Sequence, residues 1–209
     1  MSMQFKGFDE AYAALFPEIW RAALLTSADR AAAEELTFQA FLRLGAASPE
    51  TDAKATVYAA LCDQIRAFYE RKPRRLPRRD SFAAALPFPV TDALWAFMRL
   101  PLCRRMALLL KLAGFDPAAS ARFLHLPAFG IRLLLRKEQE LAFLTDVLPE
   151  EGLPERISDR IYERFSERSV AVENAIHGAR FAFDRLAPLL ALAVLALFAA
   201  AWFVSESFR

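Results

Sequence analysis

Apolar residues recur every three or four positions along most of this chain. Between residues 8 and 25 the large apolar positions are Phe8, Tyr12, Leu15, Phe16, Ile19, Trp20 and Leu24. This spacing is typical of a helix that buries one face. The same kind of pattern predicts helices over residues 29–44, 53–71 and 92–100, and no strand-like alternation of useful length occurs. Glycine is scarce while alanine and leucine abound, so local propensity agrees with an all-α fold.

The stretch from residue 100 onward carries the clearest local signals. Asp116 can cap a helix because its carboxylate accepts bonds from the free N–H groups of the first turn, and Pro117 suits the first helical position. Pro127 cannot sit inside a helix, so the chain must turn there. The predicted elements are a helix over 102–113, a short helix over 117–124, a break at 125–127 and a second helix from 128 to about 147. Two helices joined by so short a turn form the frame of a helix-turn-helix.

A basic, proline-containing segment separates the first three helices from this second group. Six of the nine residues from Arg71 to Arg79 are basic and two are proline, which predicts an extended, charged linker. Such a linker could lie along nucleic acid or an acidic groove of a partner protein, contact anionic lipid, or remain solvated. We therefore expect a helical domain over 1–71, a linker over 72–91, a helix-turn-helix domain over 92–148, a juxtamembrane helix over 149–185, a transmembrane helix over 186–204 and a short tail over 205–209.

The run from Leu186 to Val204 contains no charged residue and consists almost entirely of Leu, Ala, Val and Phe. Its 19 residues would form roughly 28 Å of helix, close to the thickness of a hydrocarbon core. The alternative is a buried core helix, which the rest of the chain is too small to cover easily. The run predicts a single-pass anchor in the cell membrane, with Arg180 and Arg185 on the near side and the N-terminal bulk in the cytoplasm.

Composition narrows the chemistry further. Net charge is only +2, so any basic patch must be local. Cys62 and Cys103 lie far apart and are expected to be buried free thiols. We find no phosphate-binding glycine loop, no metal-ligand spacing and no triad candidate, with His125 and His177 the only histidines. The sequence therefore predicts no catalytic residue, no metal site and no cofactor, and a protein that is not an enzyme.

Leu100-Pro101 with Arg105, the apolar helix and Gly114 resemble region 4 of bacterial sigma factors of the extracytoplasmic-function group. The resemblance implies a helix-turn-helix that binds promoter DNA. In the second helix, however, Leu133 and Leu134 stand where polar residues are usual in the family. The alternative to DNA binding is that the apolar residues of this helix pack against the bundle while its basic residues are solvated. The DNA-binding candidates are Arg74, Arg75, Arg78 and Arg79 in the linker and Arg132, Arg136 and Lys137 in the second helix.

Residues 33–44, Ala-Glu-Glu-Leu-Thr-Phe-Gln-Ala-Phe-Leu-Arg-Leu, resemble region 2 of the same family. In the family this stretch docks on the coiled coil of the RNA polymerase β′ subunit. The resemblance implies polymerase contacts from Glu34, Glu35, Phe38, Gln39 and Phe41. Phe38 replaces a usual glutamine, and an ordinary core position for this ring is the alternative.

Two functional hypotheses follow from this order of segments. The first is a membrane-anchored sigma-factor-like transcription regulator that binds core RNA polymerase and promoter DNA. The second is a degenerate sigma-derived protein-interaction module at the membrane that has lost promoter binding. Leu133, Leu134 and the absence of the family's acidic pair at Ala118 and Ala119 favour the second. The expected partners are core RNA polymerase, promoter DNA, membrane lipid and a regulatory protein.

Overall fold

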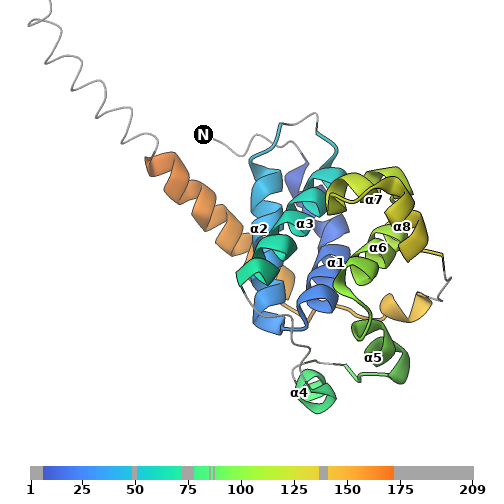
Figure 1. Cartoon of the computed structure of the whole chain (residues 1–209). Helices are drawn as coiled ribbons and strands as arrows, with labels where there is room; N and C mark the ends of the chain where they lie inside the picture. Colours follow the sequence, from blue (N-terminus) through green and yellow to red (C-terminus); the bar gives the residue numbers. More distant parts are fainter. Residues whose placement is uncertain are drawn as a thin grey trace, which may run out of the picture. The chain divides into compact units, whose positions relative to one another are not determined.

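The computed structural model describes residues 7–48, 51–71, 78–84, 86, 88–136 and 141–171, and these residues form helices, turns and loops without a strand (Figure 1). The prediction of an all-α fold is confirmed for this part of the chain. The described residues as far as Tyr162 belong to one compact unit, and those from residue 163 onward belong to a second. Of the second unit, residues 163–171 are described and are helical.

Three long helices pack pairwise at the N-terminal end: α1 (Phe8–Ser27), α2 (Arg30–Gly45) and α3 (Ala53–Arg71). Their bounds match the predicted ranges closely, because capping and apolar spacing are local signals. Asp29 caps α2, and its carboxylate accepts a 3.1 Å hydrogen bond from the Ala32 N–H. The fully buried large side chains of this group include Phe16, Ile19, Trp20, Leu24, Leu25, Phe41, Leu44 and Leu61.

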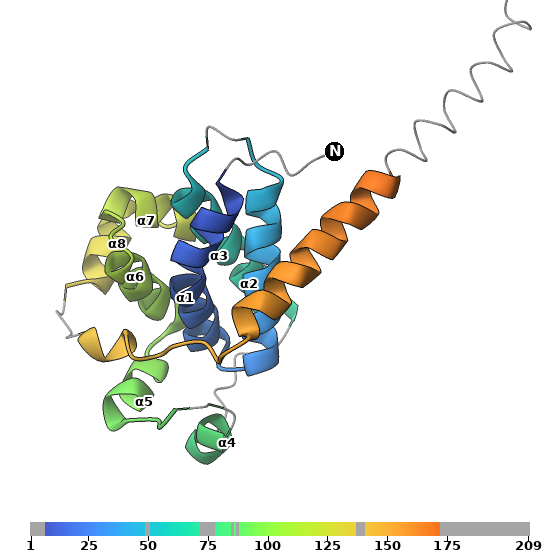
Figure 2. The same ribbon diagram turned by 180° about the vertical axis from the view of Figure 1, so that it is seen from behind.

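A second group of shorter helices follows: α5 (Asp92–Met98), α6 (Leu102–Leu112), α7 (Pro117–Leu124) and α8 (Ala128–Leu134). Helices α6, α7 and α8 contact one another, while α6 also contacts α1 and α7 contacts α3. Figures 1 and 2 show this group beside the first three helices from opposite sides. The contacts place both groups within the same compact unit.

The linker prediction is wrong in one place. Residues Arg79–Ala84 form a short helix, α4, where we expected extended chain. The last proline before it is Pro77, and Asp80 lies in its first turn, where an acidic side chain favours the helix dipole. Phe82 is buried, and its ring centroid lies 6.3 Å from that of Trp95. Burial of this aromatic side chain favours a short helix over an extended linker.

The second helix of the helix-turn-helix is also shorter than predicted. It ends at Leu134 rather than near Val147, and residues Ala142–Leu144 form a separate 3-10 turn, η1, which contacts α5. Leu144 and Val147 are buried, and Arg21 of α1 donates hydrogen bonds to the carbonyls of Thr145 and Val147, each at 3.1 Å. The buried arginine thereby supplies donors to two carbonyls of the segment that follows η1.

Helical structure resumes at residue 153 and is described as far as residue 171. We expected a juxtamembrane helix over 149–185, so the helix begins four residues later than the predicted boundary. The predicted membrane span over 186–204 lies outside the described residues. Among the residues that the structure does describe, no helix is long and apolar enough to cross a membrane.

Candidate docking face and helix-turn-helix

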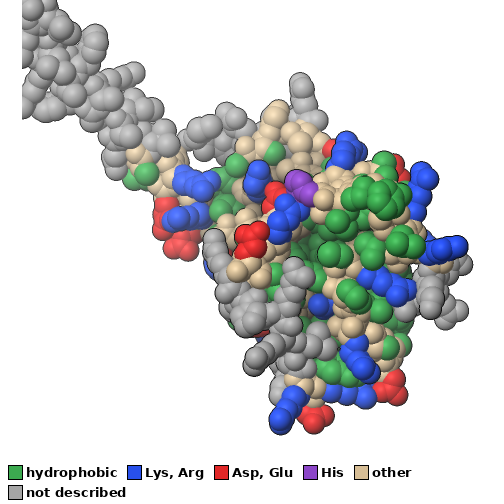
Figure 3. Space-filling view, viewed as in Figure 1, with side chains coloured by type: hydrophobic (Ala, Val, Ile, Leu, Met, Phe, Trp, Pro, Cys, Tyr) green, Lys and Arg blue, Asp and Glu red, His purple; other side chains and the backbone are tan. Residues whose placement is uncertain are grey.

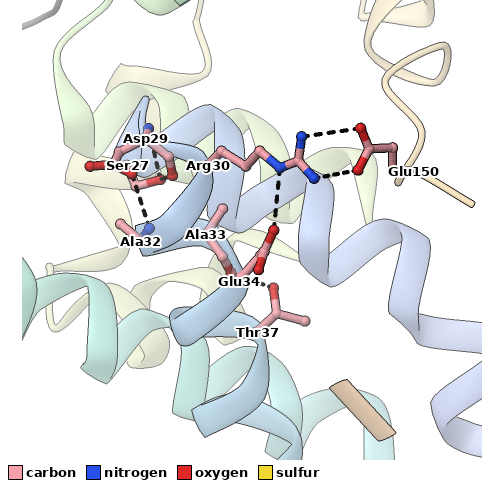
Figure 4. Close-up of polar contacts among 8 residues, drawn as sticks. All are labelled: Ser27, Asp29, Arg30, Ala32, Ala33, Glu34, Thr37 and Glu150. Atoms are coloured by element: carbon pink, nitrogen blue, oxygen red, sulfur yellow. Dashed lines mark hydrogen bonds and ion pairs between the residues drawn. The ribbon is translucent and has the colours of Figure 1, made fainter. Parts of the chain in front are cut away.

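Helix α2 is fixed at its N-terminal end by polar contacts that Figure 4 shows in detail. Arg30 donates from Nε to Glu34 at 3.3 Å and from its two terminal nitrogens to both carboxylate oxygens of Glu150, one of them at 3.1 Å. The hydrogen bond to Glu150 is the largest cause of the raised pKa of Arg30. This fork joins the first turn of α2 to a segment 120 residues further along the chain.

The residues that the resemblance assigns to polymerase docking do not all reach the surface. Glu35 is the most accessible, and its carboxylate accepts from Gln39 at 2.8 Å, which keeps the two side chains together on one exposed edge. Glu34 is half-buried beside Arg30. Phe38 is 7% exposed, and Phe41 is fully buried. Phe41 packs with its ring centroid 4.6 Å from that of Tyr12, so it is a core residue rather than a contact residue.

A shallow groove of about 430 Å³ separates α2 from α3 next to this edge. Its lining is mostly apolar with a few polar groups, a combination that ligand and peptide sites commonly share. Glu35 and Gln39 line it from α2 and Gln64 from α3. Its lining residues are Asp29, Ala31, Ala32, Glu35, Leu36, Gln39, Gln64, Ala67 and Phe68. The predicted docking residues Glu35 and Gln39 are therefore brought together at a concave surface.

The two short helices predicted on either side of residues 125–127 are present as α7 and α8. Asp116 caps α7 by accepting from the Ala119 N–H at 2.6 Å, and Pro117 occupies the first turn, as predicted. At the other end His125 adopts a left-handed conformation with φ 50°, and the Leu126 N–H donates back to the Ala121 carbonyl at 3.0 Å. This is the hydrogen-bond pattern that closes helices at a glycine. Helix α8 begins three residues later.

Helix α8 has one buried side chain and an exposed face of mixed character. Ile131 is fully buried toward the other helices. On the outer face the exposed fractions are 73% for Phe129 and 63% for Leu133, one helical turn apart, while Arg132 and Arg136 are exposed as well. Figure 3 shows hydrophobic side chains gathered over the region of α7 and α8, with basic side chains around them.

The structure describes only some of the other basic residues predicted to bind DNA. Arg74, Arg75 and Lys137 lie outside the described residues. Arg78 and Arg79 are exposed, and Arg79 donates to Asp92 at 2.7 Å and to the Val90 carbonyl at 3.1 Å. Arg79 thus holds the short helix α4 against the start of α5.

Three side chains that are not among the predicted site residues make long-range contacts in this part of the molecule. Arg160 lies 2.9 Å from Glu35 and places its guanidinium 4.4 Å from the centre of the Phe38 ring. Arg105 is buried and donates to the Leu25 carbonyl of α1 at 2.5 Å. Asp63 of α3 lies 3.8 Å from His125 in the turn before α8. Arg105 stood out in the sequence within its motif, whereas no local signal pairs residue 160 with residue 35.

The cysteine prediction is half right, because Cys62 is buried but Cys103 is exposed. At the start of α6, Arg105 points inward while Cys103 faces solvent. Burial raises the pKa of the Cys62 thiol to about 12. No group of His, Cys, Asp and Glu side chains suited to a metal ion occurs among the described residues.

Comparison with known proteins adds no assignment to these surfaces. No protein-family model matches the chain, and no curated protein and no solved structure is significantly similar to it. Function must therefore be argued from the two surfaces themselves.

Proposed function

We propose that this chain is a sigma-factor-like transcription regulator that binds core RNA polymerase through α2 and promoter DNA through α8. The observation that carries the proposal is the orientation of α8 within the helix-turn-helix. Ile131 anchors the helix inward, while Arg132 of α8 and Arg136, two residues past its end, are exposed. Basic side chains on the second helix of such a motif are suited to phosphate oxygens and base edges.

Local charge supports the DNA-binding part. Residues 101–136 contain six Lys and Arg residues and one Asp, a net charge of +5, whereas the whole chain carries +2. Helices α7 and α8 contain no acidic residue. Each phosphate that a basic side chain neutralises releases counterions, so an excess of this size would give salt-dependent affinity for a duplex.

The polymerase-binding part rests on the exposed edge of α2. Glu35 and Gln39 are hydrogen-bonded to each other beside the groove between α2 and α3, and both are residues that the region 2 resemblance assigns to docking. The uncharged run over 186–204 would hold the regulator at the membrane. Alkaline carbonate extraction of cell membranes tests the anchor, and recovery of the chain in the soluble fraction would refute it.

The DNA-binding test compares the full chain with the double variant Arg132→Ala, Arg136→Ala, each in complex with core polymerase. Fluorescence anisotropy of a labelled promoter library gives the affinity as a function of salt. We expect the slope of log affinity against log salt to fall by about 2 in the variant, since each lost phosphate contact contributes about 0.9. Arg99→Ala, which removes an exposed charge at the end of α5, is the matched control. An unchanged slope in the double variant contradicts the assignment of α8.

A second candidate function is favoured by the apolar part of the same helix. Phe129 and Leu133 are both exposed, one helical turn apart. Exposed apolar side chains in this arrangement suit an apolar groove of a partner protein better than they suit the phosphate backbone of DNA. In this alternative the chain binds polymerase or another protein without opening promoters. Polymerase binding with no open complex at any promoter of the library would favour this module over the regulator.

A further inference from the structure

Residues 150–162, which we name the return segment, lie against α1 and α2 after the chain has left the helix-turn-helix. Three aliphatic side chains of this segment are buried at successive helical turns, namely Leu153, Ile157 and Ile161. Their spacing of four residues gives the segment a single apolar stripe. Figure 2 shows the start of this helix beside α2.

The polar contacts of the return segment reach the predicted docking residues directly. Arg160 forms an ion pair with Glu35 at 2.9 Å and stacks its guanidinium over Phe38 at 4.4 Å from the ring centre. Glu150 pairs with Arg30 at the start of α2. A partner that binds Glu35 and Phe38 must therefore compete with Arg160 for both side chains.

The return segment also contacts α1. The Tyr12 hydroxyl donates to the Pro154 carbonyl at 2.6 Å, and the Tyr162 hydroxyl donates to Asp9 at 2.5 Å. The Tyr162 ring meets that of Phe8 edge to face, with centroids 6.3 Å apart. Contacts at both ends hold the segment in one position on α1 and α2.

We propose that the return segment is a built-in ligand of the α1–α2 face, and that polymerase reaches Phe38 and takes Glu35 from Arg160 only by displacing it. This inference rests on the docking role proposed above for α2. An intramolecular ligand lowers the apparent affinity of a competitor by the fraction of molecules that are open. The Arg160–Glu35 pair lies at the exposed rim, with side-chain exposures of 47% and 52%, where a competitor can exchange with it.

The first experiment tests the covering contact without any polymerase. A labelled peptide of residues 149–162 is titrated into the full chain and into the variant Ile157→Glu, whose return segment cannot bury its stripe. We expect the peptide to bind the variant and to bind the wild-type chain at least tenfold more weakly. Arg160→Glu is the second opened variant, because its exposed side chain can change without loss of the fold. Equal peptide binding by all three proteins would overturn the proposal.

The second experiment measures the affinity of each full chain for core polymerase. Arg160→Glu removes the ion pair and the cation–π contact and should open the segment, which predicts roughly tenfold tighter binding. Arg156→Glu, an equal charge reversal at an exposed position of the same helix, should leave the affinity unchanged. Equal affinity of the wild-type chain and Arg160→Glu refutes the displacement. Peptide binding to the opened variants with no polymerase binding by any chain refutes the polymerase assignment and leaves the covering contact supported.

Discussion

Replacing Arg105 by methionine tests what joins the helix-turn-helix group to the first helix. The Arg105 side chain extends from α6, is 4% exposed and donates to the Leu25 carbonyl at 2.5 Å. That carbonyl belongs to the last turn of α1, where the carbonyls lack donors from within the helix. Arg105 therefore serves as a capping group that comes from another helix, with its positive charge at the favourable end of the α1 dipole.

Two opposing effects set the magnitude. A hydrogen bond from a charged donor is worth about 1.5–3 kcal/mol, and its loss leaves the Leu25 carbonyl buried without its donor. Against this, burial lowers the pKa of Arg105, a sign that the guanidinium is poorly solvated, while interaction with Tyr69 partly compensates. Methionine keeps the apolar stem in place, so lost packing contributes little. We expect Arg105→Met to lower the free energy of unfolding by about 2 kcal/mol, and Arg105→Lys by less.

The measurement is urea unfolding of the full chain, followed by tryptophan fluorescence. Trp20 lies in α1, is 1% exposed and reports on the core that Arg105 closes. A change in midpoint without a change in slope would locate the effect in the folded state. If Arg105→Met were as stable as the wild-type chain or more so, desolvation of the guanidinium would outweigh its hydrogen bonds, and the capping argument would be refuted.

Further predictions concern two backbone positions and the two thiols. Gly114 has φ 85° and open space around its α-carbon, so Gly114→Ala should cost about 1 kcal/mol of unfolding free energy through backbone strain alone; urea titration that finds no loss would contradict this. His125, at φ 50°, should show the opposite sign: His125→Gly relieves the strain and is expected to raise the melting temperature by a few degrees (about 2–4 °C per kcal/mol), and a thermal scan that finds a lower melting temperature would contradict this. At pH 8 a thiol reagent should label Cys103 rapidly and Cys62 only on unfolding, as mass spectrometry of the modified peptides would reveal. Burial raises the pKa of Cys62 to about 12, so ionisation of this thiol favours the unfolded chain. The contribution of the neutral thiol to the free energy of unfolding is complete below the pKa of the unfolded thiol and is lost as pH rises toward 12. A Cys62→Ala variant should therefore lose less free energy of unfolding over this pH range.

Much of the helical order could be predicted because its signals are local. Asp116 and Pro117 define the start of α7 through contacts within one turn, and Asp29 does the same for α2. The bounds of α3 agree with the prediction at both ends. Where a helix begins depends mainly on the residues at that point, so the sequence is sufficient there.

The predictions that were wrong concern places where contacts between residues distant in the sequence decide the structure. Apolar spacing past Leu134 continues to favour helix, yet Arg21 binds the carbonyls of Thr145 and Val147, and no pattern near residue 140 reveals that arginine. Phe41 fits the docking motif equally well as a core residue, and only the packing against Tyr12 decides between the two. The return segment was predicted only as part of a juxtamembrane helix over 149–185. Its contacts with Glu35 and Phe38 depend on a fold that brings together residues 125 positions apart.

The two hydrogen bonds of Arg21 also have a consequence for synthesis. Their acceptors lie 124 and 126 residues downstream, so the guanidinium has neither carbonyl while the earlier part of the chain leaves the ribosome. At 5–20 residues per second the wait is about 6–25 s. During that interval water hydrates the guanidinium, and burying this side of the first helix before residue 147 has emerged would remove that hydration without supplying the two carbonyls.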